Sequence, residues 1–181
     1  MDLTERTVSS KTIYEGRILR LRVDTVELPN GKQALREVAD HPGGVAIVAI
    51  DSDGNLLTVK QYRYAFSRVF EEIPAGKLEP GEDPREAALR ELREETGAEP
   101  KQLLELGELV VSPGAYGEVL HLYLAEDLEL HEQSPDEDEF LEIIKTPFEE
   151  MLRRALSGEL RDAKTVIGIL KTDALRRQNK L

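Results

Sequence analysis

The pattern of apolar and polar residues predicts an antiparallel pair of strands near the start of the chain. From Ile18 to Val26 the two kinds alternate, with Leu19, Leu21 and Val23 on one side and Arg20, Arg22 and Asp24 on the other, as in a half-buried strand. The Asn30-Gly31 pair tolerates the positive backbone angles of a tight turn, so residues 33–39 are expected to return alongside. We predict a small β appendage over residues 1–41, preceding a domain over residues 42–181.

A second hairpin is predicted at the centre of that larger domain. The run Gly44–Asp51 is apolar without interruption, which is typical of a strand buried on both faces. A turn at Asp53-Gly54-Asn55 then leads into a strand over Leu56–Tyr64. Two further strand-like segments lie near Leu103–Val111 and Glu118–Ala125.

Helical spacing and capping signals predict three helices. The clearest runs from Pro84 to Thr96, because Asp83 can cap its start and Gly97 can end it. Two others are expected over Pro147–Ser157, with the proline in the first turn, and over Ala163–Arg177. Strands and helices together indicate an α+β fold.

Composition narrows the range of partners. The chain has 36 acidic and 24 basic residues and a formal charge of -12, which disfavours nucleic acid and anionic membranes. It contains no cysteine, so a bound metal would depend on oxygen ligands, and Mg²⁺ or Mn²⁺ is expected. There is no apolar segment of signal-peptide or membrane-spanning type, and a cytoplasmic protein is expected.

The predicted helix over residues 84–96 carries the candidate chemistry. Glu91, Glu94 and Glu95 are three or four residues apart and therefore project from one side. Each like-charged pair destabilises a helix by about 0.2–0.5 kcal/mol, which a divalent cation would more than offset. The competing interpretation is an ordinary solvated helix, in which neighbouring arginines neutralise these glutamates.

The spacing around this helix resembles the Nudix box. Gly76 is followed after five residues by Glu82, then after seven by Arg90-Glu91, Leu92, Glu94-Glu95, Gly97 and Ala98, a pattern of 23 residues with every position present. The resemblance implies an α/β/α sandwich with a mixed sheet. It also implies that Glu91, Glu94 and Glu95 are metal ligands and that Arg90 orients a glutamate. Glu82 is then either an outer metal ligand or a residue that supports the other ligands.

Flanking segments resemble the ADP-ribose pyrophosphatase branch of that family. They are Gln61-Tyr62-Arg63, Glu72-Ile73-Pro74-Ala75-Gly76, Ser112-Pro113-Gly114 and the acidic sequence DEDEFLEI at residues 136–143. The resemblance implies that Arg63 contacts a phosphate, that Glu72 and the Gly114 loop hold the nucleotide or terminal ribose, and that the Ala75 carbonyl completes a metal site. The resemblance also makes Glu139 the candidate base. Glu139, Glu95 and Arg90 are thus the candidate catalytic residues. The same resemblance implies a homodimer, in which Tyr14 stacks on adenine.

The activity implied by this branch is Mg²⁺-dependent hydrolysis of ADP-ribose to AMP and ribose 5-phosphate. The box itself does not select the substrate, so GDP-mannose, another nucleoside diphosphate sugar, a flavin or a dinucleotide stays open. A second alternative is a regulatory module that binds a nucleotide without cleaving it. The complete set of Glu91, Glu94 and Glu95 argues against that alternative.

Overall fold

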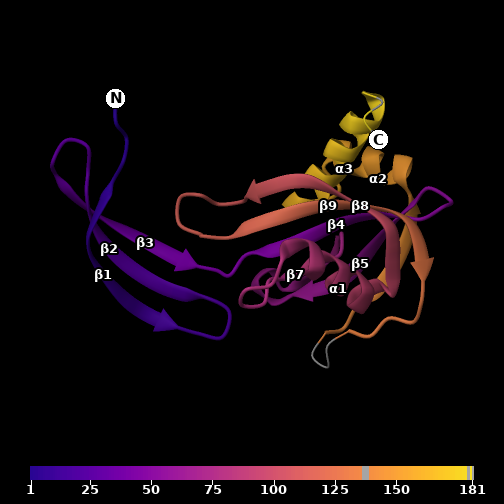
Figure 1. Ribbon diagram of the computed structural model, residues 1–181, viewed down its shortest axis with the longest axis horizontal. Helices are drawn as coiled ribbons and strands as arrows, with labels where there is room; N and C mark the ends of the chain where they lie inside the picture. Colours follow the sequence, from indigo (N-terminus) through magenta and orange to yellow (C-terminus); the bar gives the residue numbers. More distant parts are fainter. Residues whose placement is uncertain (136–138, 179, 181) are drawn as a thin grey trace. The chain divides into compact units, whose positions relative to one another are not determined.

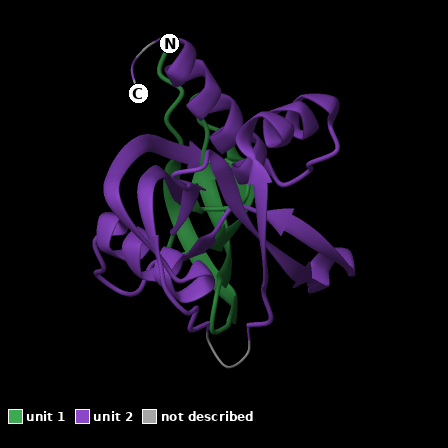
Figure 2. Cartoon of the chain, turned by 90° about the vertical axis from the view of Figure 1, so that its right-hand side faces the viewer, with its two compact units in different colours: residues 1–43, 110–119 green, residues 44–109, 120–181 purple. Residues whose placement is uncertain are grey.

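The computed structural model describes residues 1–135, 139–178 and 180. Within them the chain divides into two compact units, one formed by residues 1–43 and 110–119 and the other by residues 44–109 and 120–181 (Figure 2). The fold is α+β, with a mixed sheet, α-helices and a separate antiparallel sheet at the N-terminus, which confirms the predicted class.

The first unit contains an antiparallel sheet in the order β1-β2-β3, formed by β1 (Arg6–Glu15), β2 (Arg20–Glu27) and β3 (Gln33–Asp40). The predicted β2–β3 hairpin is confirmed: Gly31 has φ of 79°, and its N–H donates to the Leu28 carbonyl at 2.9 Å. The strand β1 was not predicted, because all of its residues are exposed and show no alternation of burial.

Asp24 lies with Arg22 on the polar side of β2, as predicted, but it is buried, with only 4% of its surface exposed. Its carboxylate forms an ion pair with Arg22, which also donates to Asp40 on β3. The neighbouring arginine thus supplies the opposite charge that a buried aspartate requires.

The second unit is built on a sheet with the path β10-β5-β4-β9-β8, to which β6 adds beside β5 and β7 beside β4. Its strands are β4 (Gly44–Ile50), β5 (Asn55–Arg63), β6 (Arg68–Glu72), β7 (Ala75–Lys77), β8 (Ala98–Val110), β9 (Val119–Leu130) and β10 (Glu142–Pro147), with a 3₁₀ turn, η1 (Tyr64–Phe66), between β5 and β6. The sheet is mixed because β4 runs parallel to β9 and antiparallel to β5 and β7.

Helices cover both faces of this sheet (Figure 1). Every residue of β4 is buried, and alternate residues belong to different cores. Val45, Ile47 and Ala49 pack in the cluster that contains Ala87, Ala88 and Leu92 of α1 (Pro84–Thr96). The intervening β4 residues pack in the cluster that contains α2 (Phe148–Ser157) and α3 (Ala163–Arg177). The apolar run was therefore correctly predicted to be a strand buried on both faces, and the layers form an α/β/α sandwich.

The helix boundaries agree with the capping signals, with one exception. The Asp83 side chain accepts from the Arg85 N–H at 2.9 Å, and Gly97 ends α1 with φ of 68°. The exception is Pro147, which was placed inside a helix but has extended backbone angles and pairs with Asn55 as the last residue of β10. Over the described residues, no helix is long and apolar enough to span a membrane.

Candidate active site

Arg90 connects the charged groups on and before α1. Its guanidinium donates to Glu82 at 2.9 and 3.0 Å, to Glu91 at 2.8 Å and to Glu94 at 3.0 Å. Hydrogen bonding to Glu82 is the main reason why the pKa of Arg90 is raised. One permanently charged side chain thus fixes the direction of three carboxylates, two of them on the predicted metal-binding side of the helix.

Gly76 allows Glu91 to lie against the strand that precedes the helix. A Cβ atom built on Gly76 would overlap the carboxyl group of Glu91, well inside the 3.0 Å limit that real Cβ contacts respect. The first glycine of the box is therefore explained by close packing of a backbone against a carboxylate. Burial, opposed by Arg90, raises the pKa of Glu91, and repulsion from Glu94 and Glu139 adds to the effect.

Glu95 is the most deeply buried of the box glutamates, with 2% of its surface exposed. Its Oε2 accepts the Ala75 N–H at 3.0 Å, which places this carboxylate beside β7. Burial raises the pKa of Glu95 to about 8, and the charges of Glu91 and Glu139 push it in the same direction. Such a shift in a buried acid accompanied by other acids is typical of functional sites.

The carboxylate groups around α1 are ligands of the type that divalent cations bind. Among residues 1–135, 139–178 and 180, no three acidic side chains converge on one point, since Arg90 lies between Glu91 and Glu94. However, Glu91 and Glu95 repel one another, and both have raised pKa values. A cation would relieve this repulsion, and the donor set consists of the hard oxygen ligands that Mg²⁺ prefers.

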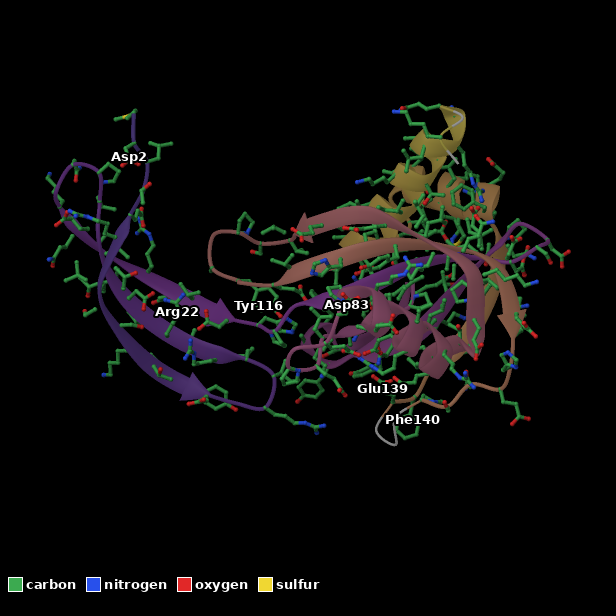
Figure 3. The ribbon with its side chains drawn as sticks, in the orientation of Figure 1. Asp2, Arg22, Asp83, Tyr116, Glu139 and Phe140 are labelled. Carbon is green, nitrogen blue, oxygen red and sulfur yellow. The ribbon has the colours of Figure 1, made fainter. Side chains whose placement is uncertain are left out.

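The acidic loop after β9 is attached to the C-terminal end of α1. The His131 N–H donates to the Gly97 carbonyl at 2.8 Å, and the Ser134 N–H donates to the Glu94 carbonyl at 3.0 Å. Glu137 and Asp138 of this loop lie outside the described residues. Glu139, labelled in Figure 3, is among the described residues. Its charge raises the pKa of both Glu91 and Glu95. The structure thus brings the candidate base close to the box glutamates.

Glu139 also lines a pocket of about 490 Å³. The exposed aromatic residues Tyr62, on β5, and Phe140 form part of its wall, together with Lys60. A volume of this order is typical of small-molecule sites. The pocket offers apolar faces next to the acidic group.

Arg63 and Glu72 form an ion pair on neighbouring strands. Arg63 Nε and Nη2 donate to the two carboxylate oxygens of Glu72 at 2.9 and 2.7 Å. A third residue, Lys164 of α3, also donates to Glu72. Burial alone would raise the pKa of Glu72, but Arg63 and Lys164 outweigh it and hold the pKa below its ordinary value. Sequence reasoning missed Lys164, because nothing in the local pattern distinguishes it from a surface lysine.

Two of the predicted substrate residues belong to the first unit. Gly114 lies in a turn in which the Ala115 and Tyr116 N–H groups both donate to the Ser112 carbonyl. Tyr14 is an exposed residue of β1 that pairs with Leu21. The structure gathers the other candidates, from Arg63 to Glu139, within the second unit.

Comparison with known proteins gives matches over most of the chain. The model of the NUDIX domain matches residues 40–166, and that of a nucleoside diphosphate sugar hydrolase N-terminal domain matches residues 5–39. An ADP-ribose pyrophosphatase of Bacillus subtilis (strain 168) is 44% identical over 169 residues, which cover 92% of this chain and 91% of that protein. A methanol dehydrogenase activator of Bacillus methanolicus is 45% identical over 167 residues, covering 91% and 90%.

A solved structure shows the same fold. The crystal structure of an ADP compounds hydrolase aligns with a TM-score of 0.85 over 100% of both chains, at 23% sequence identity. At this identity the likeness concerns the fold alone.

Proposed function

Because the chain belongs to the NUDIX domain family, we propose that it hydrolyses the diphosphate of ADP-ribose, giving AMP and ribose 5-phosphate. The observation that carries hydrolysis is the grouping of Glu91, Glu95 and Glu139, in which burial and mutual repulsion raise the pKa of the first two. The choice of ADP-ribose is supported by the similarity to the pyrophosphatase of Bacillus subtilis, which extends over nearly the whole of both chains.

Enzymes of this family generally need divalent cations, and we propose Mg²⁺, held by Glu91, Glu94, Glu95 and the Ala75 carbonyl. A bound divalent ion neutralises phosphate oxygens and lowers the pKa of water. Arg90 orients Glu91 and Glu94 through the hydrogen bonds described above. In this scheme Ala75 and Glu95 are already in contact through the backbone N–H.

Glu139 acts as the base in the proposed reaction. It takes a proton from the attacking water while the water oxygen bonds to phosphorus and the bond from phosphorus to the bridging oxygen breaks. Arg63 contacts a phosphate oxygen, and Glu72 and the Gly114 loop hold the nucleotide or terminal ribose. The position of Glu139, within electrostatic reach of Glu91 and Glu95, supports this assignment.

We also propose that the chain forms a homodimer through its N-terminal sheet. In the single chain, β1 is exposed along its whole length, with Val8 and Ile13 among its exposed apolar residues. An exposed edge of this kind is normally covered or protected. In such a dimer Tyr14, which is also exposed, would stack on the adenine of the substrate.

Product analysis tests the proposed activity. The protein is incubated with ADP-ribose and Mg²⁺, beside an EDTA control and a variant carrying Glu94→Gln and Glu95→Gln. We expect AMP and ribose 5-phosphate in the first reaction and neither product in the two controls. Turnover of GDP-mannose, NADH or a nucleoside triphosphate without turnover of ADP-ribose would refute the substrate. Binding without turnover of any of them would favour a regulatory module.

A further inference from the structure

Glu72 is a buried carboxylate held by two cations from different elements. Its side chain is 3% exposed, and it lies at the end of β6. Arg63 reaches it from β5 with two hydrogen bonds, and Lys164 reaches it from the first turn of α3. Two positive charges therefore face the buried Glu72 carboxylate, and one of them, Lys164, is shared with a second acid, Asp162.

The two cations differ in how they are held. The Lys164 side chain is 12% exposed, and its ammonium group also lies 3.0 Å from Oδ2 of Asp162, the residue that caps α3. The Asp162 carboxylate accepts from the N–H and the hydroxyl of Thr165. The Thr165 hydroxyl oxygen in turn accepts the N–H of Ile73 at 2.9 Å, and Ile73 directly follows Glu72 in the chain. Lys164 is thus part of a continuous set of bonds that joins α3 to the end of β6.

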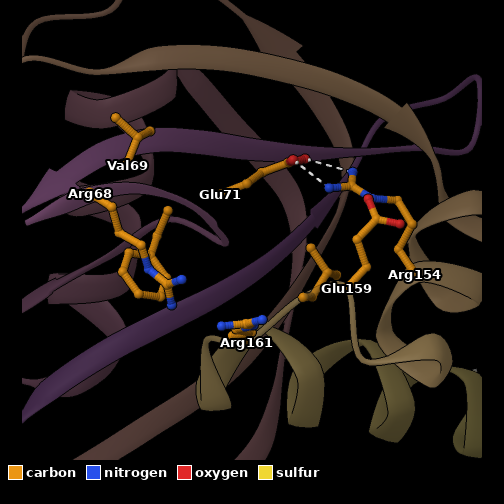
Figure 4. A pocket seen from close by; sticks show the side chains of 8 residues that line it. Arg68, Val69, Glu71, Arg154, Glu159 and Arg161 are labelled. Atoms are coloured by element: carbon orange, nitrogen blue, oxygen red, sulfur yellow. Dashed lines mark hydrogen bonds and ion pairs between the residues drawn. The ribbon is translucent and has the colours of Figure 1, made fainter. Parts of the chain in front are cut away.

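The other face of β6 is attached as well. Glu71 accepts from Arg154 of α2 at 3.2 and 2.8 Å (Figure 4), and it also accepts from the Thr58 hydroxyl at 3.0 Å. Glu71 and Arg154 border a pocket of about 330 Å³, in which Arg154 also donates to Glu159. Since β6 is tied on both faces, Glu72 cannot readily move with Arg63 if Arg63 changes position.

Arg63 is the more accessible of the two cations. Its side chain is 40% exposed, and its Nη1 lies outside the pair with Glu72. It is also close enough to Glu95 for the two charges to interact, which places it beside the candidate active site. The exposed cation can reach an anionic ligand, whereas the buried one stays with Glu72.

We propose that Lys164 is a positioning residue for substrate binding, which keeps Glu72 neutralised so that the Arg63 guanidinium is available to the diphosphate. Without Lys164, release of Arg63 would leave a buried charge with no counter-charge from these two residues, and such a charge is strongly destabilising. Glu72 would then retain Arg63, and the substrate would have to compete with it. This inference rests on the proposed function, because that proposal assigns Arg63 to a phosphate.

Steady-state kinetics with ADP-ribose test the inference. In Lys164→Met we expect KM to rise about tenfold, equivalent to about 1.4 kcal/mol, with kcat changed much less. Lys164→Arg keeps the charge and should restore most of the affinity. The matched control is Lys171→Met, the same substitution at an exposed position of the same helix, and it should leave KM unchanged. An unchanged KM in Lys164→Met would overturn the proposal.

A double-mutant cycle separates positioning from direct contact. In a Glu72→Gln background the buried charge is absent, so Lys164→Met should have no further effect on KM. A persistent tenfold effect would mean that Lys164 binds the substrate itself, and would refute the positioning role. Calorimetric binding of ADP-ribose to the same variants gives the comparison without turnover. Wild-type binding without hydrolysis would refute the proposed function alone, and no binding by the wild type would overturn both.

Discussion

The packing of Gly76 against Glu91 makes a sharp prediction for the variant Gly76→Ala. The added Cβ atom would overlap the Glu91 carboxyl group, so Glu91 must move away from its present position. Overpacking of this kind costs about 1–3 kcal/mol. Loss of the 2.8 Å bond between Arg90 and Glu91 adds a contribution of similar size, about 1.5–3 kcal/mol before partial exposure of both groups reduces it. We therefore expect Gly76→Ala to lower the free energy of unfolding by about 2–4 kcal/mol.

In a chain of this length each kcal/mol lowers Tm by about 2–4 °C, so a thermal melt followed by circular dichroism should show a decrease of about 4–16 °C. We expect Gly76→Ala to reduce activity more strongly than it reduces stability. Displacing a positioned group by about 1 Å can reduce the rate 10²-fold, and Glu91 is one of the proposed metal ligands. We expect kcat to fall by about that factor in the part of the protein that remains folded.

Gly117→Ala is the control, because its added Cβ would make an ordinary contact at 3.5 Å with the Ala39 carbonyl and its φ is not in the positive range that favours glycine. This variant should keep both Tm and kcat close to the wild-type values. If Gly76→Ala behaved like Gly117→Ala in both measurements, the close packing of Gly76 on Glu91 would not be what the box glycine provides.

Three further predictions concern acids and the N-terminal sheet. Without metal, the folded protein keeps Glu95 protonated between pH 4.5, its ordinary pKa, and about pH 8, so the free energy of unfolding should fall by on the order of a few kcal/mol as pH rises through this range. Glu95→Gln should remove this pH dependence in thermal melts recorded with EDTA, and parallel pH profiles of the two proteins would contradict the prediction. Glu139→Gln should lower kcat about 10²–10⁴-fold with little change in KM, and a smaller loss in single-turnover assays would assign the base elsewhere. A variant with Val8→Glu and Ile13→Glu should be monomeric in size-exclusion chromatography with light scattering while the wild type is a dimer; a monomeric wild type would refute the dimer.

The parts of the fold that could be predicted are those set by neighbouring residues. The cap at Asp83 and the glycine at position 97 define α1 because they satisfy the free N–H and C=O groups at the helix ends. The run Gly44–Asp51 predicted β4 because seven consecutive buried residues need a covering layer on each face. In both cases the physical requirement is local, so a short stretch of sequence was sufficient.

Other strands depend on pairing with distant residues. β6, β7 and β10 were not predicted: β7 contains three residues, one of them glycine, and it is a strand because it pairs with β4. β10 pairs with β5, and this pairing keeps Pro147 extended even though a proline often opens a helix. Such segments have no periodic pattern of their own, and tertiary contacts decide their conformation.

The candidate site likewise contains one part that is set by neighbouring residues and another that depends on distant contacts. The glutamates of α1 are recognised because a helix places residues three and four apart on one side, and this spacing is visible in the sequence. The bonds that tie Glu72 to Lys164 join residues 92 positions apart, and no spacing rule relates them. A buried carboxylate nevertheless requires a counter-charge, so Glu72 by itself predicts that a cation is near. The sequence did not identify that cation, because Arg63 was predicted only as a phosphate contact and β6 was not predicted. The pairing of β5 with β6 reveals Arg63 as one partner of Glu72, and the docking of α3 reveals Lys164 as the second, so that Arg63 can be released to a ligand.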